Sequence, residues 1–305
     1  MRKLIRNFLN KFGYDLVKVN QHSNDKASKT KMVMVGKFPI YMPGNNPQLS
    51  TYKYLPTAND QLARLVECVA KKYSDLCVID IGANVGDTIA VVKSLIDVPI
   101  IAVEGDATSY KFLEKNITQF KNIFPINTFL GEKKETLHVS MDKEGWNNTI
   151  IPTETGDKTI AVKTLDEVLQ EQHLTAKRLK LLKVDTEGFD TIILRGAEEL
   201  IATQKPVIYF EYNRENMDAI KEDGLSTLLS LKKYNYNTIY FFDNIGRYLL
   251  SCPIEQHDIL LQLHQYTNGR SSLISYYDVC IFNDEDFALG KEFIEAEKTL
   301  AYEHD

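Results

Sequence analysis

The chain has 305 residues, of which 44% are hydrophobic and 26% are charged, and its formal net charge is -6. This length allows one large domain or one domain with extensions. Charges of both signs are interspersed, which argues against a phosphate-binding surface and therefore against nucleic acid as a partner.

Cysteine usage and the lack of long apolar runs favour a cytoplasmic location. The four cysteines lie far apart without a C-x-x-C pair, and Cys77 and Cys280 fall in apolar runs. This pattern indicates buried free thiols in a reducing compartment. No apolar run approaches the length of a membrane span, and the first residues lack the pattern of a secretory signal. We therefore expect a cytoplasmic protein.

The first twelve residues predict a short basic amphipathic helix. One helical face gathers Leu4, Ile5, Phe8, Leu9 and Phe12. Such a helix can dock on its own domain, on a second copy in a homo-oligomer, or weakly on a membrane surface. We expect docking, because so short a helix buries little area. Residues 1–50 are interpreted as an extension in which a polar linker precedes a strand or hairpin and a proline-containing loop.

A strand, a tight turn and a helix over 77–95 organise the rest of the chain. Apolar residues lead up to Asp80, small and turn-forming residues follow, and a helical pattern begins at Thr88. A turn of this kind presents backbone N–H groups and the positive end of a helix to a ligand. The sequence therefore predicts a nucleotide-like ligand at this turn.

The glycine spacing in the turn distinguishes between classes of ligand. A dinucleotide-binding turn needs glycines where the chain has Asn84 and Asp87, and the tripeptide of a phosphate-binding P-loop does not follow. The remaining interpretation is a turn for S-adenosylmethionine, with the pattern Asp80-x-Gly82-x-Asn84-x-Gly86. Asn84 takes the place of the usual middle glycine, and asparagine tolerates a left-handed backbone.

Strands and helices alternate along the chain. Helices are predicted over 60–71 with Asn59 or Asp60 as its cap, 107–118 and 190–203, and strands over 100–104, 123–129, 181–185 and 207–211. This alternation predicts an α/β fold with a doubly wound, mostly parallel sheet. Apolar runs at 238–242, 248–250 and 279–282 predict antiparallel strands that close the sheet.

The alternation breaks between 131 and 166. Two short strands, over 136–140 and 159–163, are expected to flank a polar loop that contains Trp146, Asn147 and Asn148. An indole beside two amides fits sugar stacking and hydroxyl recognition, and hydrophobic anchoring of the loop is an equal alternative. His138 could act as a general base, but a surface or structural histidine is the expectation.

The C-terminal part is expected to contain a helical segment over 214–233, split near Gly224, and a final charged helix over 287–305. The side chains available for docking this last helix are Phe287, Phe293, Ile294 and Leu300. The resulting organisation is an extension over 1–50, a main domain over 51–286 with the insertion at 131–166, and the terminal helix.

Two motifs follow one another along the chain. The first is the turn followed by Ile101-Ala102-Val103-Glu104, and the second is Lys183-Val184-Asp185-Thr186-Glu187-Gly188 followed by Ile-Leu-Arg-Gly-Ala over 193–197. Together they resemble the motifs of the FkbM-type methyltransferases, which are S-adenosylmethionine-dependent O-methyltransferases. The resemblance covers roughly residues 50 to 215. The chain has Gly105 where proline often follows the acidic residue. The resemblance implies a Rossmann-like class I methyltransferase fold and a hydroxyl of a glycan or other natural product as methyl acceptor.

A set of residues around the turn is predicted to bind the cofactor. Glu104, at the end of the next strand, can accept the protons of both ribose hydroxyls. Asp80 organises the turn or meets the cofactor's ammonium indirectly, with a purely structural cap as the alternative. The full set is Asp80, Gly82, Asn84, Gly86, Asp87, Glu104, Gly105 and the residues expected near adenine, Asn127, Thr128 and Phe129, of which Phe129 could instead be core.

Carboxylates at the ends of two further strands are the candidate catalytic groups. Asp185 and Glu187 are two apart on a segment interpreted as extended, so they should face the same side. They can serve as general base, as metal ligands or as acceptors from a substrate hydroxyl, while Glu187 could simply cap the next helix. Glu211 could complete a cluster for Mg²⁺, but a metal is not favoured because a carboxylate base suffices for methyl transfer.

The combined interpretation is an S-adenosylmethionine-dependent O-methyltransferase that acts on a glycan or small-molecule hydroxyl. Catalysis would come mainly from in-line positioning, with Asp185, Glu187, Glu211 or His138 as proton acceptor. The alternatives are an N-methyltransferase with the same cofactor and a non-catalytic cofactor-binding or scaffold protein.

Overall fold

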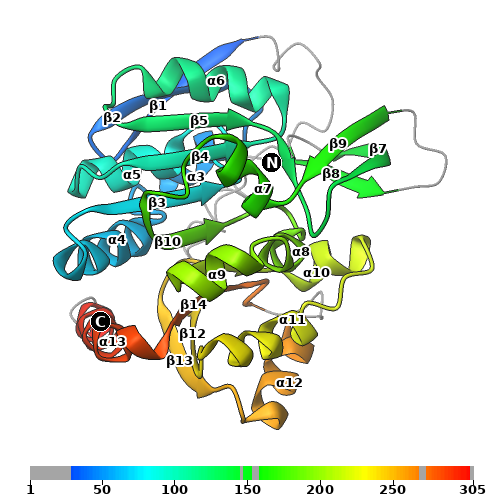
Figure 1. Cartoon of the computed structure of the whole chain (residues 1–305). Helices are drawn as coiled ribbons and strands as arrows, with labels where there is room; N and C mark the ends of the chain where they lie inside the picture. Colours follow the sequence, from blue (N-terminus) through cyan, green and yellow to red (C-terminus); the bar gives the residue numbers. More distant parts are fainter. Residues whose placement is uncertain (1–28, 145–146, 153–157, 268–272, 303–305) are drawn as a thin grey trace, which may run out of the picture.

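A computed structural model describes residues 29–144, 147–152, 158–267 and 273–302. Its centre is an eight-stranded sheet with the order β13-β12-β14-β11-β10-β3-β4-β5 (Figure 1). The strands of this sheet are β3 (Leu76–Ile81), β4 (Ile100–Glu104), β5 (Ile123–Asn127), β10 (Arg178–Val184), β11 (Val207–Tyr212), β12 (Thr238–Asp243), β13 (Tyr248–Pro253) and β14 (Tyr277–Phe282). From β5 to β11 neighbouring strands are parallel, and β14 and β13 run antiparallel to their neighbours. The predicted doubly wound sheet with antiparallel closing strands is confirmed.

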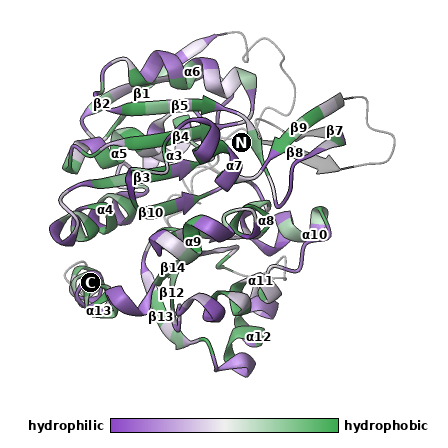
Figure 2. Ribbon diagram, viewed as in Figure 1, coloured by the Kyte–Doolittle hydropathy of each residue, from purple (hydrophilic) through white to green (hydrophobic). Residues whose placement is uncertain are grey.

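The central strands of this sheet are rich in hydrophobic residues (Figure 2). Their side chains enter two separate core clusters, one on each side, so helices cover both faces of the sheet. All six residues of β3 are buried. Cys77, Ile79 and Ile81 join one core cluster, while Leu76 and Val78 join the other. This division follows from the alternation of side chains along a strand.

One face of the sheet is covered by α4 (Asp60–Lys72), α5 (Asp87–Leu95), α6 (Ala107–Ile117) and α13 (Phe287–Tyr302). The other is covered by α7 (Leu165–Glu171), α8 (Asp190–Arg195), α9 (Glu198–Gln204), α10 (Arg214–Ala219), α11 (Leu225–Ser230) and α12 (His257–Tyr266). The short 3-10 helices are η1 (Leu231–Tyr234) and η2 (Asp284–Asp286). In α13, Phe293 and Ile294 are buried as expected, whereas Phe287 remains 41% exposed and does not dock.

The insertion forms a second, four-stranded sheet with the order β6-β9-β7-β8. Its strands are β6 (Phe129–Leu130), β7 (Glu135–Glu144), β8 (Asn147–Pro152) and β9 (Lys158–Lys163). The predicted strands correspond to β7 and β9, but the expectation of a polar loop between them is wrong over 147–152. Residues 149–151 are Thr-Ile-Ile, whose β-branched side chains favour a strand, and β8 pairs with the extended β7.

The first described residues form the predicted hairpin, β1 (Thr30–Val35) and β2 (Phe38–Pro43), followed by α3 (Gln48–Tyr54) in place of the expected loop. Val35, Ile40 and Tyr52 pack against α5 in a third core cluster. The sequence-derived helix over residues 1–12 lies outside the described residues.

Several element boundaries differ from the predictions. The helix expected over 190–203 is split into α8 and α9 at Gly196, a residue that is unfavourable inside a helix. Glycine fits there because a Cβ would lie 2.0 Å from the Gly131 carbonyl oxygen. Asn59 occupies the N-cap position of α4, as predicted, but it adopts a left-handed conformation and its side chain makes no cap hydrogen bond. The unpredicted α7 begins with a capping box between Thr164 and Glu167, a signal that the sequence contains.

All four cysteines are buried free thiols, as predicted. Within the described part of the chain, no helix combines the length and the apolar composition needed to span a bilayer.

Candidate active site

A cavity of about 220 Å³ opens at the carboxyl ends of β3, β4 and β10. The turn after β3 and the start of α5 contribute Ile81, Gly82, Asn84, Asp87 and Thr88, and the end of β4 with the start of α6 contributes Val103, Glu104, Gly105, Asp106 and Ser109. The end of β10 and α8 contribute Lys183, Asp185, Thr186, Glu187, Phe189 and Ile193, and the remaining wall consists of Gln48, Asn59, Thr128, Phe129, Leu130, Leu137, Ile160 and Val162. The topology thus brings together most of the residues predicted from four separate parts of the sequence.

The turn after β3 has the tight geometry that its composition predicts. Gly82, Asn84 and Gly86 all have positive φ, of 73°, 47° and 86°. The Gly82 and Ala83 N–H groups donate to the Val103 carbonyl at 2.9 and 3.1 Å. A Cβ at Gly82 would lie 1.8 Å from the Asp185 carbonyl oxygen, so glycine is required where the end of β10 approaches the turn.

Glu104 connects this turn to the one after β4. Its Oε2 accepts from the Asn84 N–H at 2.9 Å, and its Oε1 accepts from the Asp106 N–H at 2.7 Å. Burial raises the pKa of Glu104 to about 7. Each carboxylate oxygen retains a further lone pair for a ligand hydroxyl. Nearby, Asn84 Oδ1 and Thr186 Oγ1 are buried without a hydrogen-bond partner, which marks polar groups able to meet a bound ligand.

Asp80 is held by a residue to which the sequence interpretation assigned no role. The ammonium of Lys183 lies 2.9 Å from Asp80 Oδ1, and Thr88 Oγ1 donates to Asp80 Oδ2 at 2.6 Å. Lys183 also reaches Asp185 Oδ2 at 3.6 Å and the carbonyls of Ile81 and Gly82. Burial alone would lower the pKa of Lys183, but the charges of Asp80 and Asp185 raise it above its ordinary value. Asp80 therefore organises the turn through this ion pair.

Asp87 forms a buried contact with the N-terminal part of the structure. Tyr52 of α3 donates its hydroxyl proton to Asp87 Oδ2 at 2.9 Å, and Asn59 Nδ2 donates to the Tyr52 oxygen at 3.1 Å. Burial raises the pKa of Asp87 to about 6. Gln48 of α3 and Asn59, which precedes α4, line the cavity, and Tyr52 lies behind Asp87. None of the three belongs to a recognisable motif, because only tertiary packing brings them to this site.

The loop after β10 positions the two main candidate catalytic carboxylates. Asp185 is about half exposed, at 48% of its side chain, and lines the cavity together with Glu187. The segment is not extended as expected, since Glu187 has a left-handed φ of 54° and a tight turn presents it. Asn216 Nδ2 donates to Glu187 Oε2 at 2.8 Å. Burial, with the charge of Asp185, raises the pKa of Glu187 to about 7.

A third carboxylate, Asp190, holds this loop in place. Its oxygens accept from the N–H groups of Thr186 at 3.3 Å and Gly188 at 3.2 Å. Asp190, and not Glu187, therefore satisfies the amide groups that precede α8. Burial, with the charge of Asp185, raises the pKa of Asp190 to about 7.

Glu211 lies on β11, the strand next to β10, but does not line the cavity. It is paired in register with Asp278 of β14, and Asn213 donates to its Oε1 at 3.2 Å. Burial and the neighbouring charges of Asp185 and Asp190 raise the pKa of Glu211 well above its ordinary value. Among the described residues, no three His, Cys, Asp or Glu side chains are arranged to hold a metal ion.

The other residues predicted to bind the cofactor differ in whether they line the cavity. Gly105, Thr128 and Phe129 line the cavity, and a Cβ at Gly105 would meet the Phe129 ring at 2.2 Å. Asn127 is exposed and donates to the Glu104 carbonyl at 2.8 Å, so its side chain supports the turn from outside the cavity.

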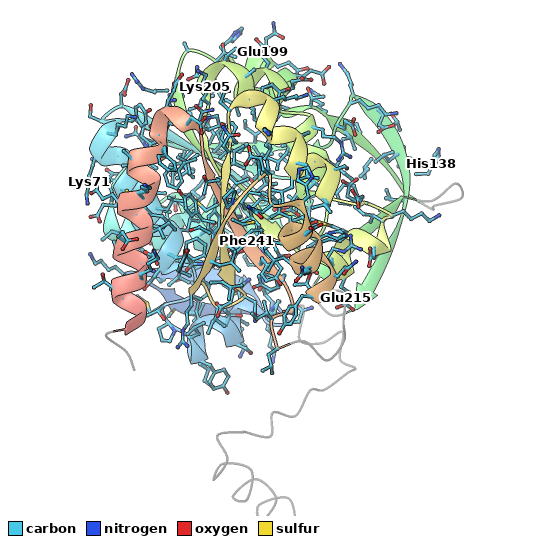
Figure 3. All side chains as sticks on the ribbon, turned by 90° about the horizontal axis from the view of Figure 1, so that it is seen from below. Lys71, His138, Glu199, Lys205, Glu215 and Phe241 are labelled. Carbon is cyan, nitrogen blue, oxygen red and sulfur yellow. The ribbon has the colours of Figure 1, made fainter. Side chains whose placement is uncertain are left out.

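His138 is exposed on β7 and does not line the cavity, whereas its neighbour Leu137 on the opposite face does. Figure 3 shows His138 at the periphery of the molecule. Asn147 and Asn148 belong to β8, where their backbones pair with Glu144 and Lys143. Trp146 lies outside the described residues.

Comparisons with known proteins relate this chain to methyltransferases. No curated protein matches it. A solved FkbM methyltransferase from Methylobacillus flagellatus is 18% identical, with a TM-score of 0.37, over 53% of this chain and 38% of that one. The chain thus spans well under two thirds of that protein.

Two further solved structures cover more of the chain at lower identity. The plantazolicin methyltransferase BamL, solved with SAH, is 12% identical over 78% of this chain and 90% of that one, with a TM-score of 0.42. A structure described as that of a caffeoyl-CoA O-methyltransferase from Staphylococcus aureus is 12% identical over 73% of this chain and 83% of that one, with a TM-score of 0.39.

The model of the methyltransferase FkbM domain matches residues 80–238, which is just over half of the chain and contains both motifs noted in the sequence. The chain has the Rossmann-like class I methyltransferase fold expected from its sequence, and it belongs to the FkbM methyltransferase family.

Proposed function

We propose that this protein is an S-adenosylmethionine-dependent O-methyltransferase whose acceptor is a hydroxyl of a glycan or other natural product. The observation that carries the proposal is one cavity that joins the turn after β3 to the carboxylates Asp185 and Glu187. Family membership supports methyl transfer, and the choice of a hydroxyl depends on these carboxylates. We also propose a cytoplasmic location, which the four free thiols favour.

The residues around the turn fit the proposed cofactor. Glu104 retains acceptor capacity for ribose hydroxyls, and the unpaired Asn84 Oδ1 and Thr186 Oγ1 can meet polar groups of the ligand. Phe129 and Leu130 supply an apolar wall suited to adenine. S-adenosylmethionine, when bound, supplies an electrophilic methyl group on a sulfonium.

A hydroxyl acceptor needs a group that takes its proton. Asp185 and Glu187 both face the cavity, and a pKa near 7 makes Glu187 effective as a base near neutral pH. Asn216 fixes the direction of the Glu187 carboxylate, and the amide bonds to Asp190 fix the loop that carries both groups. A carboxylate base of this kind contributes about 10² to 10⁴ in rate and does not depend on a metal.

The test combines acceptor panels with amide variants. Purified protein is incubated with S-adenosylmethionine and either sugar and polyol acceptors or amine acceptors, and the products are identified by mass spectrometry. We expect methyl ethers as products, with activity unchanged by a chelator. Asp185→Asn and Glu187→Gln should retain affinity for S-adenosylhomocysteine within about threefold. At least one of them should lose turnover by about 10² to 10⁴.

Glu215→Gln provides the matched control, because Glu215 is an exposed carboxylate on α10 (Figure 3). It should keep full turnover. Methylated amines in place of ethers would replace the proposal by N-methylation. Cofactor binding without turnover on any acceptor would favour a non-catalytic role.

A further inference from the structure

An exposed apolar and basic surface lies on the N-terminal part of the structure, away from the residues that carry the proposed chemistry. We define the β1–α3 face as Lys31, Met32, Met34, Lys53 and Tyr54. Met32, Met34 and Tyr54 are exposed by 52%, 49% and 64%. The two lysines and the two methionines line a shallow groove together with Val33, Gly36, Leu49, Tyr52 and Pro56.

The exposure of the two methionines follows from the hairpin. Val33 and Val35 point toward the core, so the alternating positions Met32 and Met34 point outward. Lys31 lies on the side of Val33 but is exposed near the start of β1, where it lines the same groove as the two methionines. β1 pairs only with β2, which leaves its other edge free of strand partners within the described residues. An exposed edge strand normally carries polar side chains, and adjacent large apolar ones mark an interaction surface.

The described residues that form this face are basic, although the whole chain is acidic. Residues 27–59 contain four lysines and no Asp or Glu. The described elements β1, β2 and α3 contain no acidic side chain to neutralise Lys31 and Lys53.

We propose that the β1–α3 face docks on an anionic lipid bilayer. Flexible apolar side chains such as methionine can enter the headgroup boundary, while the flanking lysines keep their ammonium groups among the lipid phosphates. A nucleic acid would use the lysines but offers no apolar phase to Met32 and Met34. A second copy of the same face would bring like charges together. An anionic bilayer is therefore the partner that binds both the exposed apolar side chains and the lysines of this surface.

Helix α3 connects this face to the cavity. The Tyr52 side chain lines the groove and its hydroxyl donates to Asp87, while Gln48 and Asn59 on either side line the cavity. Docking would therefore bring the cavity close to the membrane surface. The inference itself does not depend on the proposed reaction.

The experiment is flotation of the full chain with vesicles of phosphatidylcholine alone or of equal parts phosphatidylcholine and phosphatidylglycerol. We expect binding to the anionic vesicles only, and loss of binding in about 1 M salt, where the Debye length falls to about 3 Å. The double variant Lys31→Glu and Lys53→Glu should reduce the partition coefficient by about 20-fold or more. The double variant Met32→Ser and Met34→Ser should reduce it by about tenfold.

Matched control variants test whether the effect is specific to this face. Ile259→Ser with Leu261→Ser changes two residues of α12 that are similarly exposed, by 42% and 43%. Lys71→Glu with Lys291→Glu changes two exposed lysines of α4 and α13. Both control pairs should bind like the unaltered chain, and melting curves identify any variant that fails to fold.

Three outcomes would overturn the proposal. The unaltered chain could fail to float with anionic vesicles. Folded variants of the face could float as well as the unaltered chain, which would place the membrane contact elsewhere. Finally, duplex DNA could displace the protein from the vesicles when the DNA phosphate concentration equals that of the lipid phosphate, and the variant Met32→Ser with Met34→Ser could bind the vesicles normally. Together these two results would identify a general site for polyanions.

Discussion

The Nζ atom of Lys183 lies 2.9 Å from Oδ1 of Asp80, and the two side chains are only 3% and 5% exposed. The pair joins the ends of two adjacent parallel strands, β10 and β3, whose residues Lys183 and Asp80 are also paired in register. A buried ion pair adds little net stability, but removal of one partner leaves an uncompensated charge. The turn that faces the cavity therefore depends on both residues.

Lys183→Met should destabilise the protein strongly. Asp80 would remain buried without its cation, at a cost of about 3 to 5 kcal/mol in the free energy of unfolding. Denaturant unfolding measures this change. The double variant Asp80→Asn with Lys183→Met should recover part of the loss, because it removes both charges.

Lys180 provides the control, because it is a second buried lysine on β10, and its ammonium donates to the Gln204 carbonyl at 2.6 Å. Lys180→Met leaves no carboxylate unpaired and should cost about 1 to 2 kcal/mol. Equal losses in the free energy of unfolding for Lys183→Met and Lys180→Met would show that the ion pair with Asp80 contributes no more than the hydrogen bond of Lys180.

Glu104→Ala should weaken the binding of S-adenosylhomocysteine by about 100-fold or more, since two hydrogen bonds to a charged group are lost at about 1.5 to 3 kcal/mol each. Titration calorimetry measures the affinity. Glu114→Ala, on the exposed side of α6, should bind normally. Unchanged affinity in folded Glu104→Ala would remove the ribose assignment.

The ligand-free protein should become more stable as the pH falls from about 8 to about 6. Burial raises the pKa values of Glu104, Glu187, Asp190 and Asp278 to about 7. Unfolded carboxyl groups titrate near pH 4, so within this window the folded state binds more protons than the unfolded state, and stability falls with rising pH.

Scanning calorimetry at several pH values checks the sign. Saturating S-adenosylhomocysteine should reduce the pH dependence, because the ribose hydroxyls are expected to bind ionised Glu104. A melting temperature that instead rises steadily from pH 6 to pH 8 would show that these groups are already ionised in the folded protein.

Gly82→Ala should abolish cofactor binding and lower stability. A Cβ there would lie 1.8 Å from the Asp185 carbonyl oxygen, so the end of β10 must move away from the turn. Gly36 in the β1–β2 turn also has a positive φ, but its obstacle is the Ser94 side chain. Gly36→Ala should cost about 1 to 2 kcal/mol of backbone strain and leave affinity for S-adenosylhomocysteine unchanged. Equal affinity of Gly82→Ala and Gly36→Ala for S-adenosylhomocysteine would contradict the requirement for glycine at position 82.

The sequence was sufficient to predict the elements that depend on local pattern. The alternation of apolar strands with amphipathic helices predicted the doubly wound sheet, because a strand buried on both faces is apolar throughout. The pattern from Asp80 to Gly86 predicted the turn, since positive φ angles restrict the residues that can occupy it. Because the strands are parallel, their carboxyl ends meet, and this placed Glu104 and Asp185 at one edge.

Only the tertiary structure decided which side chains meet in the cavity. Lys183 lies in an apolar strand, and its role emerges only when β3 brings Asp80 beside it. Tyr52 reaches Asp87 from a helix 35 residues earlier in the chain. Conversely, His138 and Glu211 have suitable chemistry, but neither lines the cavity. His138 is exposed on the face of β7 opposite to Leu137, and Glu211 is half-buried on β11 beside Asp278. Local pattern determines backbone conformation, whereas contacts between distant residues depend on register and packing that no short window of sequence contains.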